Sequence, residues 1–189
     1  LIDTWGGEVV ERRLAGDGLI ELCSIAGVML EKADIIVVTG GASVGERDHA
    51  KEIFVPHGIE WLFSKVAIKP GKPVWIGRCG GKYIVGLPGN PTSAMVTARL
   101  FLAPLLAILV GRPWQVALAW RRILVMGDIK PDLIREHFPR ARMENGLAVL
   151  LPSQDSGRQK PLATADLLVR ASTVEKEDEG RISAVYLDF

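Results

Sequence analysis

The chain has 189 residues, of which 48% are hydrophobic and 24% are charged. These fractions are typical of globular proteins and exclude disordered and collagen-like chains. The 23 Lys and Arg residues nearly balance the 22 Asp and Glu residues, which gives a formal net charge of +1. Because the overall electrostatic field is weak, we expect neither a nucleic acid nor a membrane as a partner, and any anion selectivity must be local.

Cys23 and Cys79 are the only cysteines, and no Cys-x-x-Cys or Cys/His spacing suits a zinc site. We therefore expect both thiols to be reduced. The longest apolar stretch, residues 103–110, contains Pro104 and falls far short of the roughly 20 residues that span a membrane. The sequence begins at Leu1 without an initiator Met or a secretory leader, so we expect a fragment of a soluble, cytoplasmic protein.

The first part of the chain alternates short β-rich apolar runs with helix-like segments, a pattern that predicts a mostly parallel sheet between crossover helices. We therefore expect a three-layer α/β domain over residues 1–113, with its N-terminal strand missing. In chain order, the expected elements are a strand at 8–10, a helix at 17–32, a strand at 35–38, a helix at 48–57, a strand at 61–68, and two strands at 74–77 and 82–87.

A long helix is expected at residues 91–110. Its only charge is Arg99 and it is apolar on nearly every side, which is typical of a helix that is buried all round. A single domain of this size rarely buries such a helix completely, so we expect it to form a homodimer interface. Pro104 should kink the helix.

The pattern changes after residue 113 to short strands with charged turns, which predicts a second, small domain over residues 114–189. Strands are expected at 147–151, 167–171 and 182–189, with a solvated connection at 175–180. A domain of short strands with this length favours a small all-β, barrel-like fold.

The first candidate loop, residues 39–48, directly follows the buried strand expected at 35–38. Ligands bind at the carboxyl ends of parallel strands, and glycines let backbone N–H groups approach an oxyanion closely. Asp48, at the exit of the loop, is suited to cap the next helix or to hold a hydrated divalent cation. The alternative is a plain tight turn with a capping Asp. The glycines and the hydroxyl of this loop belong to Gly40, Gly41, Gly45 and Ser43.

The second candidate loop carries three lysines. Lys65 and Lys69 lie four residues apart on an extended run, so the two-residue period of a strand puts them on the same face. The Pro-Gly turn at 70–71 directs Lys72 back toward the same region. Three ammonium groups so close together would repel one another unless an anion lay between them. The alternative is a surface hairpin with solvated lysines.

The third candidate loop, residues 86–94, precedes the long helix. Asn90 is a favoured N-cap and Pro91 a favoured first helical residue, so the free N–H groups of the helix open onto this loop. A helix N-terminus preceded by Gly89 is suited to bind an anion. The alternative is an ordinary strong helix start without a ligand.

The three loops read Gly-Gly-x-Ser-Val-Gly-x-x-Asp, Lys-Pro-Gly-Lys-Pro and Gly-Leu-Pro-Gly-Asn-Pro-x-Ser-Ala, in this order. Together they suggest a phosphate-bearing ligand, and the combination resembles the molybdopterin molybdenumtransferase family, which includes the E domain of gephyrin. Residues 135–142 and 154–157 resemble the small C-terminal β-barrel of that family, so the likeness covers nearly the whole chain.

The resemblance implies an enzyme that inserts molybdate into adenylylated molybdopterin, releases AMP and uses a divalent cation such as Mg²⁺. It implies that Asp48 lies near the metal or the phosphoanhydride and that Lys65 and Lys69 neutralise molybdate or phosphate. Ser156 would reach the oxyanion. The implied lining of the pterin-phosphate site comprises Gly40, Gly41, Ser43, Gly45, Lys72, Pro88, Gly89, Asn90 and Ser93.

Two other functions stay open. A molybdopterin adenylyltransferase would bind the same ligand, but it usually carries a Thr-Gly-Gly-Thr-Gly loop and lacks the β-domain. A non-catalytic dimeric scaffold is the second alternative, because Lys160 and Pro161 stand where the family usually has small residues. The histidines, His49, His57 and His137, follow no ligand spacing, and we expect structural or surface roles for them.

Overall fold

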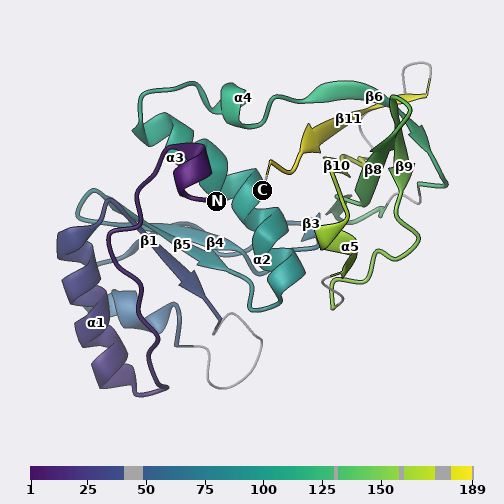
Figure 1. Ribbon diagram of the computed structural model, residues 1–189. Coiled ribbons are helices and arrows are strands. Elements are labelled where there is room, and N and C mark those ends of the chain that lie inside the picture. The colour runs from purple at the N-terminus through teal and green to yellow at the C-terminus, as the bar shows by residue number, and fades with distance from the viewer. Residues whose placement is uncertain (41–48, 130–131, 158–159, 173–179, 189) are drawn as a thin grey trace.

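The computed structural model describes residues 1–40, 49–129, 132–157, 160–172 and 180–188. Figure 1 shows an α/β part and a β-rich part lying side by side, with a long helix running between the sheet and the upper connection. Both termini lie close to this helix. The helix is therefore the element that both parts of the chain contact.

The α/β part contains a four-stranded sheet in the order β1-β5-β4-β2. One face packs against α1 (Leu19–Lys32) and the 3₁₀ helix η2 (Glu52–His57), and the other packs against the long helix. Alternate side chains of the sheet fill the two cores, since Trp75 and Ile84 belong to one cluster and Ile76 and Val85 to the other. The strands are β1 (Ile35–Thr39), β2 (Glu60–Phe63), β4 (Trp75–Cys79) and β5 (Lys82–Leu87). The three-layer α/β class predicted from the sequence is confirmed.

The sheet is mixed, so its expected mostly parallel pairing needs correction. β1 and β5 run parallel, from Ile35 opposite Tyr83 to Thr39 opposite Leu87, whereas β5 with β4 and β4 with β2 run antiparallel. The cause is the short turn between β4 and β5, where two consecutive glycines adopt positive φ angles. A turn of two residues joins neighbouring strands only in antiparallel fashion.

Three expected elements of this part differ from the structure. Residues 8–10 form no strand, because no described strand lies beside them to pair with their backbone groups. The helix expected at 48–57 is the 3₁₀ helix η2, which contains Pro56 and ends at Gly58 with φ 74°. The strand expected at 61–68 is divided into β2 and the short β3 (Ile68–Lys69), which pairs with the β-rich part instead of the sheet.

The long helix begins where the sequence predicts. It comprises α2 (Pro91–Thr97), a π-helical segment η3 (Ala98–Leu102) and α3 (Ala103–Leu109). The irregularity expected at Pro104 takes the form of this π segment, in which the N–H of Ala103 donates to the carbonyl of Ala98. The wider turn accommodates a ring that would otherwise clash with the preceding turn.

Intrachain packing accounts for most of the apolar surface of this helix. By length and composition, the helix Pro91–Leu109 would be able to cross a membrane. However, 61% of its most apolar stretch of 18 residues is buried inside the protein. Its buried residues contact Val85 and Leu87 of the sheet in one core cluster. A core helix has the same composition as a membrane span, so burial against the sheet is sufficient to explain the apolar character.

The β-rich part is a closed ring of five strands in the order β10-β11-β6-β9-β8. The pair β6–β9 is parallel and the other four pairs are antiparallel. The ring strands are β6 (Arg121–Met126), β8 (Arg140–Glu144), β9 (Leu147–Leu150), β10 (Leu167–Val169) and β11 (Arg181–Tyr186). Four short elements complete the description: η1 (Asp3–Trp5), α4 (Trp114–Ala117), β7 (Glu136–His137) and α5 (Lys160–Ala163). The expected barrel-like fold is confirmed, and the boundary after residue 113 stays a prediction.

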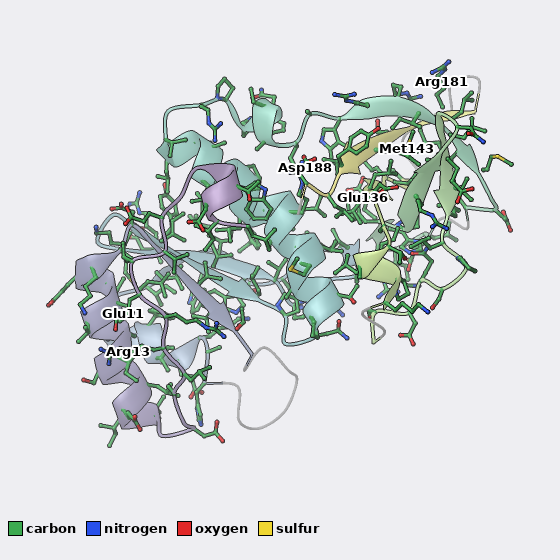
Figure 2. The ribbon with its side chains drawn as sticks, viewed as in Figure 1. Glu11, Arg13, Glu136, Met143, Arg181 and Asp188 are labelled. Atoms are coloured by element: carbon green, nitrogen blue, oxygen red, sulfur yellow. The ribbon has the colours of Figure 1, made fainter. Side chains whose placement is uncertain are left out.

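Arg99 of the π segment ties the two parts of the chain together. Its side chain is 3% exposed, and its Nε and Nη1 donate to the carbonyl oxygens of Tyr186 and Ala117 at 2.7 and 2.6 Å. Its Nη2 lies 3.2 Å from Oδ2 of Asp188, which Figure 2 labels near the middle of the molecule. The only charge of the helix thus fixes the end of the β-ring against the α/β part.

Candidate functional site

A cleft of about 250 Å³ lies where the two parts of the chain meet. The pairing of β3 with β7 forms its floor, since Ile68 lies opposite Glu136 and Lys69 opposite His137. The wall from the α/β part consists of Ile68, Lys69, Pro70, Gly71, Lys72, Pro73 and Ser93. The wall from the β-rich part consists of Arg135, His137, Phe138, Arg140, Gln154 and Ser156. A single cleft is therefore lined by four site residues that were predicted from distant segments of the sequence: Lys69, Lys72, Ser93 and Ser156.

The lysine loop is held rigidly against the long helix. A Cβ on Gly71 would lie 2.2 Å from Cγ2 of Thr97, and Gly71 has φ 113°, so only glycine fits here. The N–H of Val74 donates to the carbonyl of Gly71, and the N–H of Val66 donates to that of Lys72, both at 3.0 Å. The loop therefore presents its two lysines from a fixed backbone.

Lys65 does not line this cleft. It is exposed and lies between β2 and β3, where the chain leaves one sheet and joins the other. The extended run expected to carry Lys65 and Lys69 is interrupted between β2 and β3, so strand periodicity does not relate the two side chains, and their shared anion site stays a prediction.

The loop before the long helix contributes one side chain to the cleft. Ser93 is 7% exposed, and its backbone N–H donates to Oδ1 of Asn90 at 3.2 Å. This bond makes Asn90 the N-cap that the sequence predicts. Pro88, Gly89 and Asn90 are not among the lining residues. Their loop instead touches the first loop, because a Cβ on Gly89 would lie 3.6 Å from Cα of Gly40.

The first and third loops both leave the same edge of the sheet, since Thr39 at the end of β1 pairs with Leu87 at the end of β5. Gly40 has φ 88°, a conformation that glycine adopts without strain. The remaining predicted residues of this loop, Gly41, Ser43, Gly45 and Asp48, lie outside the described residues.

Arg140 is the functional candidate that the sequence reasoning missed. It is 1% exposed, and the cleft is the only cavity that it lines among those described. Its backbone N–H donates to Oε1 of Gln154 at 2.8 Å, and its Nε donates to the same oxygen at 3.3 Å. Gln154 in turn donates from Nε2 to the carbonyl oxygens of Arg140 and Leu151, both at 2.9 Å. These bonds hold the backbone of Arg140 and one edge of its guanidinium group against Gln154.

The guanidinium of Arg140 is incompletely paired. Its Nη1 is buried and has no hydrogen-bond partner within the described part of the chain. Burial lowers the pKa of Arg140, and the charge of Asp155 partly offsets this effect. A guanidinium nevertheless stays protonated at physiological pH. A buried cation with a free donor costs stability unless an anion pairs with it, so its environment is suited to a negatively charged ligand.

Arg135, at the mouth of the cleft, is already paired. Its Nε and Nη2 donate to Oδ2 of Asp132 at 3.1 and 2.8 Å. Asp132 also accepts the backbone N–H groups of Ile134 and Arg135 at 3.0 and 3.1 Å. The hydrogen bond from Ile134, followed by that from the Arg135 side chain, lowers the pKa of Asp132. Arg140 is therefore the arginine of the cleft with a free donor, whereas the guanidinium of Arg135 is already paired with a carboxylate.

His137 also lines the cleft, although the sequence suggested only a structural or surface role. The segment 135–142 drew attention through its family resemblance, but no individual role followed from it. Within the described residues, no group of three or more His, Cys, Asp or Glu side chains is arranged to hold a metal ion. The described lining of the cleft thus contains four cationic side chains and no carboxylate.

The protein is therefore of the α/β class, with a small β-ring attached. The α/β part and the β-ring each form one wall of a cleft that contains several cations. Residues 1–108, more than half of the chain, match the family model described as "Probable molybdopterin binding domain". The chain therefore belongs to this family, and the resemblance indicated by the three loops is confirmed.

Curated relatives support this assignment. The chain is 38% identical over 115 residues to "Molybdopterin molybdenumtransferase 2" of Mycobacterium tuberculosis, a match that covers 57% of this chain and 28% of the relative. It is 39% identical over 134 residues to the "Molybdopterin molybdenumtransferase" of Haemophilus influenzae, covering 70% and 33% of the two chains. The chain thus spans about a third of the length of these relatives.

A solved structure extends the likeness over both parts of the chain. The molybdopterin biosynthesis moeA protein from Pyrococcus horikoshii superposes with a TM-score of 0.77 at 29% identity. The superposition covers 98% of this chain and 46% of that protein. The β-ring therefore belongs to the shared fold together with the α/β part.

Proposed function

We propose that the protein acts in molybdenum cofactor biosynthesis by inserting molybdate into adenylylated molybdopterin with release of AMP. The observation that carries the proposal is the buried Arg140, which lines the cleft together with Lys69 and Lys72 and whose Nη1 has no hydrogen-bond partner among the described residues. Molybdate is a small tetrahedral dianion, and a fixed cluster of cationic and hydroxyl donors is the environment that stabilises such an anion.

Each lining side chain has a definable part in this proposal. Lys69 and Lys72 supply positive charge at the exposed side, whereas Arg140 supplies it at the buried end. Ser93 and Ser156 supply hydroxyl donors from opposite walls. Because the two walls come from the α/β part and the β-ring, the cleft is complete only when both parts are docked.

The pterin and phosphate groups of the substrate would lie beside the cleft, along the edge of the sheet where Gly40 and Gly89 are in close approach. Gly41, Ser43 and Gly45 would contribute backbone and hydroxyl donors there, by resemblance to the family. We assign Asp48 to a Mg²⁺ ion on the same ground, since a carboxylate is the ligand that this cation prefers. The ion would neutralise negative charge on the phosphoanhydride.

The proposal is tested by measuring AMP release from adenylylated molybdopterin as molybdate is added, with the wild-type protein and with Arg140→Met. Molybdate-dependent release that falls in the variant is expected. Arg142→Met is a matched control, because Arg142 lies two residues further along β8 and is exposed. A well-folded protein that releases no AMP at any molybdate concentration would contradict the enzymatic function and favour the scaffold alternative.

We also propose that the protein is a homodimer and acts in the cytoplasm. An exposed apolar surface, the α3–α4 patch, lies at the far end of the long helix and on α4, which packs beside it. Clustered exposed apolar residues mark protein contacts. A second copy is a suitable occupant, because two copies of one patch bury each other about a two-fold axis. The α3–α4 patch consists of Ile108, Leu109, Val110, Trp114 and Val116.

A further inference from the structure

Cationic side chains from both walls line the described part of the cleft. Lys69, Lys72 and Arg140 carry donors and no acceptor. No carboxylate is among the described residues that line the cleft. The charged side chains that an anion would meet among the described lining residues are therefore all cations.

Three carboxylates close in sequence to lining residues are engaged with neighbours of their own. Asp132 accepts four hydrogen bonds from Ile134 and Arg135. Glu136 is paired with Nε of Arg170. Asp155 accepts the backbone N–H of Gly157 at 2.9 Å. Each of these carboxylates is thus held by its own neighbours rather than directed to a ligand.

Several other acceptors around the cleft already receive hydrogen bonds. Oε1 of Gln154 accepts two bonds from Arg140. The carbonyl oxygens of Lys69 and Lys72 accept the N–H groups of Phe138 and Val66 at 2.8 and 3.0 Å. The carbonyl of Arg140 accepts both Nε2 of Gln154 and the N–H of Leu151. The acceptors left to a ligand are neutral hydroxyl, imidazole and carbonyl groups, which are weaker acceptors than a carboxylate.

We propose that this cleft selects oxyanions by their protonation state. It binds tetrahedral oxyanions that carry no proton at neutral pH, such as molybdate, tungstate and sulfate, and it discriminates against phosphate and arsenate. A hydrogen phosphate dianion has the same charge as sulfate, so the attraction of the lysines and Arg140 does not separate them. It keeps one O–H group, however, and in a donor-lined cleft this group loses the acceptor that water provides.

The inference deepens the proposed function, because a molybdate site of this kind would stay free of phosphate. Leaving a buried donor unsatisfied typically weakens binding by about tenfold or more. Two pairs of ligands test the effect of the bound proton alone, because the two members of each pair have the same charge and nearly the same size. These pairs are sulfate with phosphate and selenate with arsenate.

The experiment measures how each of these four anions displaces tungstate from the protein, by calorimetry at constant ionic strength and mildly alkaline pH, where phosphate is mostly a dianion. Sulfate and selenate are expected to compete at least about tenfold more strongly than phosphate and arsenate. Equal competition within both pairs would overturn the inference while leaving the proposed function intact. A failure of tungstate itself to bind would instead contradict the proposed function.

A pair of variants tests the same point within the protein. Ser156→Asp introduces a carboxylate acceptor into the cleft, whereas Ser156→Asn introduces a neutral side chain of the same size. The preference for sulfate over phosphate is expected to fall about tenfold in the Asp variant and to change little in the Asn variant. A proportional loss of all four anions in the Asp variant, with the preference unchanged, would contradict selection by protonation.

Discussion

Replacing Arg140 by Met separates a binding role from a structural one. Met preserves most of the volume of the side chain but removes its charge. The structural loss is small, because Nε makes only one side-chain bond, of 3.3 Å, and Nη1 makes none with the described residues. Removal of a buried and incompletely paired cation also relieves its desolvation cost. The free energy of unfolding is therefore expected to change by no more than about 1 kcal/mol.

Anion binding should respond very differently. A hydrogen bond to a charged group contributes about 1.5–3 kcal/mol, so Arg140→Met should weaken tungstate or molybdate binding by about tenfold to about 150-fold. The two quantities are measured on the same samples, by calorimetric titration and by urea unfolding. Arg142→Met, at an exposed position of the same strand, should change neither.

The opposite pattern would refute the reasoning. If Arg140→Met lost several kcal/mol of stability but bound the anion as tightly as the wild type, the guanidinium would be a structural element of the β-ring. The same conclusion would follow if the control variant at Arg142 weakened binding equally.

Three further predictions concern the framework of the site and the oligomeric state. Gly71→Ala should lower the free energy of unfolding by about 3 kcal/mol and weaken anion binding, because the new Cβ would collide with Thr97. The control in thermal unfolding is Gly146→Ala, also at positive φ but in open space, and equal losses of stability in the two variants would contradict the steric argument. Arg99→Met should destabilise the protein by about 3 kcal/mol in urea unfolding, since two carbonyls lose their donor, and an unchanged midpoint would exclude its docking role. Light scattering should give twice the 20.6 kDa chain mass for the wild type and the single mass for Ile108→Glu, whereas a wild-type monomer would contradict the dimer.

Much of the α/β part was predictable because its signals are local. The helix α1, the buried strand β1 and the strand β5 lie within one or two residues of their expected bounds. The N-cap at Asn90 was also predictable, because the side chain and the backbone N–H that it accepts are three residues apart. Such features depend on short stretches of sequence, and tertiary context does not override them.

The pairing of β3 with β7 was not predictable in the same way. Each strand is two residues long, and the partners lie 68 residues apart in the sequence, as the pairing of Ile68 with Glu136 shows. Strands of this length leave no periodic pattern. The loop lysines were therefore recognised as anion-binding candidates, but their position facing the β-ring was not.

The role of Arg140 shows a second limit of sequence reasoning. Arg140 and Arg142 are two residues apart on β8, so strand periodicity places them on the same face. Arg140 is nevertheless 1% exposed, whereas the side chain of Arg142 is 53% exposed. Gln154 makes three hydrogen bonds to Arg140 at the beginning of the strand, and a contact over this sequence distance leaves no local pattern.

The most direct test of the molybdate site is anomalous diffraction from crystals soaked in tungstate. Tungstate has the charge and shape of molybdate, and tungsten gives a strong anomalous signal that locates the anion without a prior assumption. We predict a tungsten peak in the cleft between the lysine loop and the β-ring, within hydrogen-bond distance of Nη1 of Arg140 and the hydroxyl of Ser156. A cleft that stays empty at saturating tungstate, or a peak bound only elsewhere, would contradict the assignment.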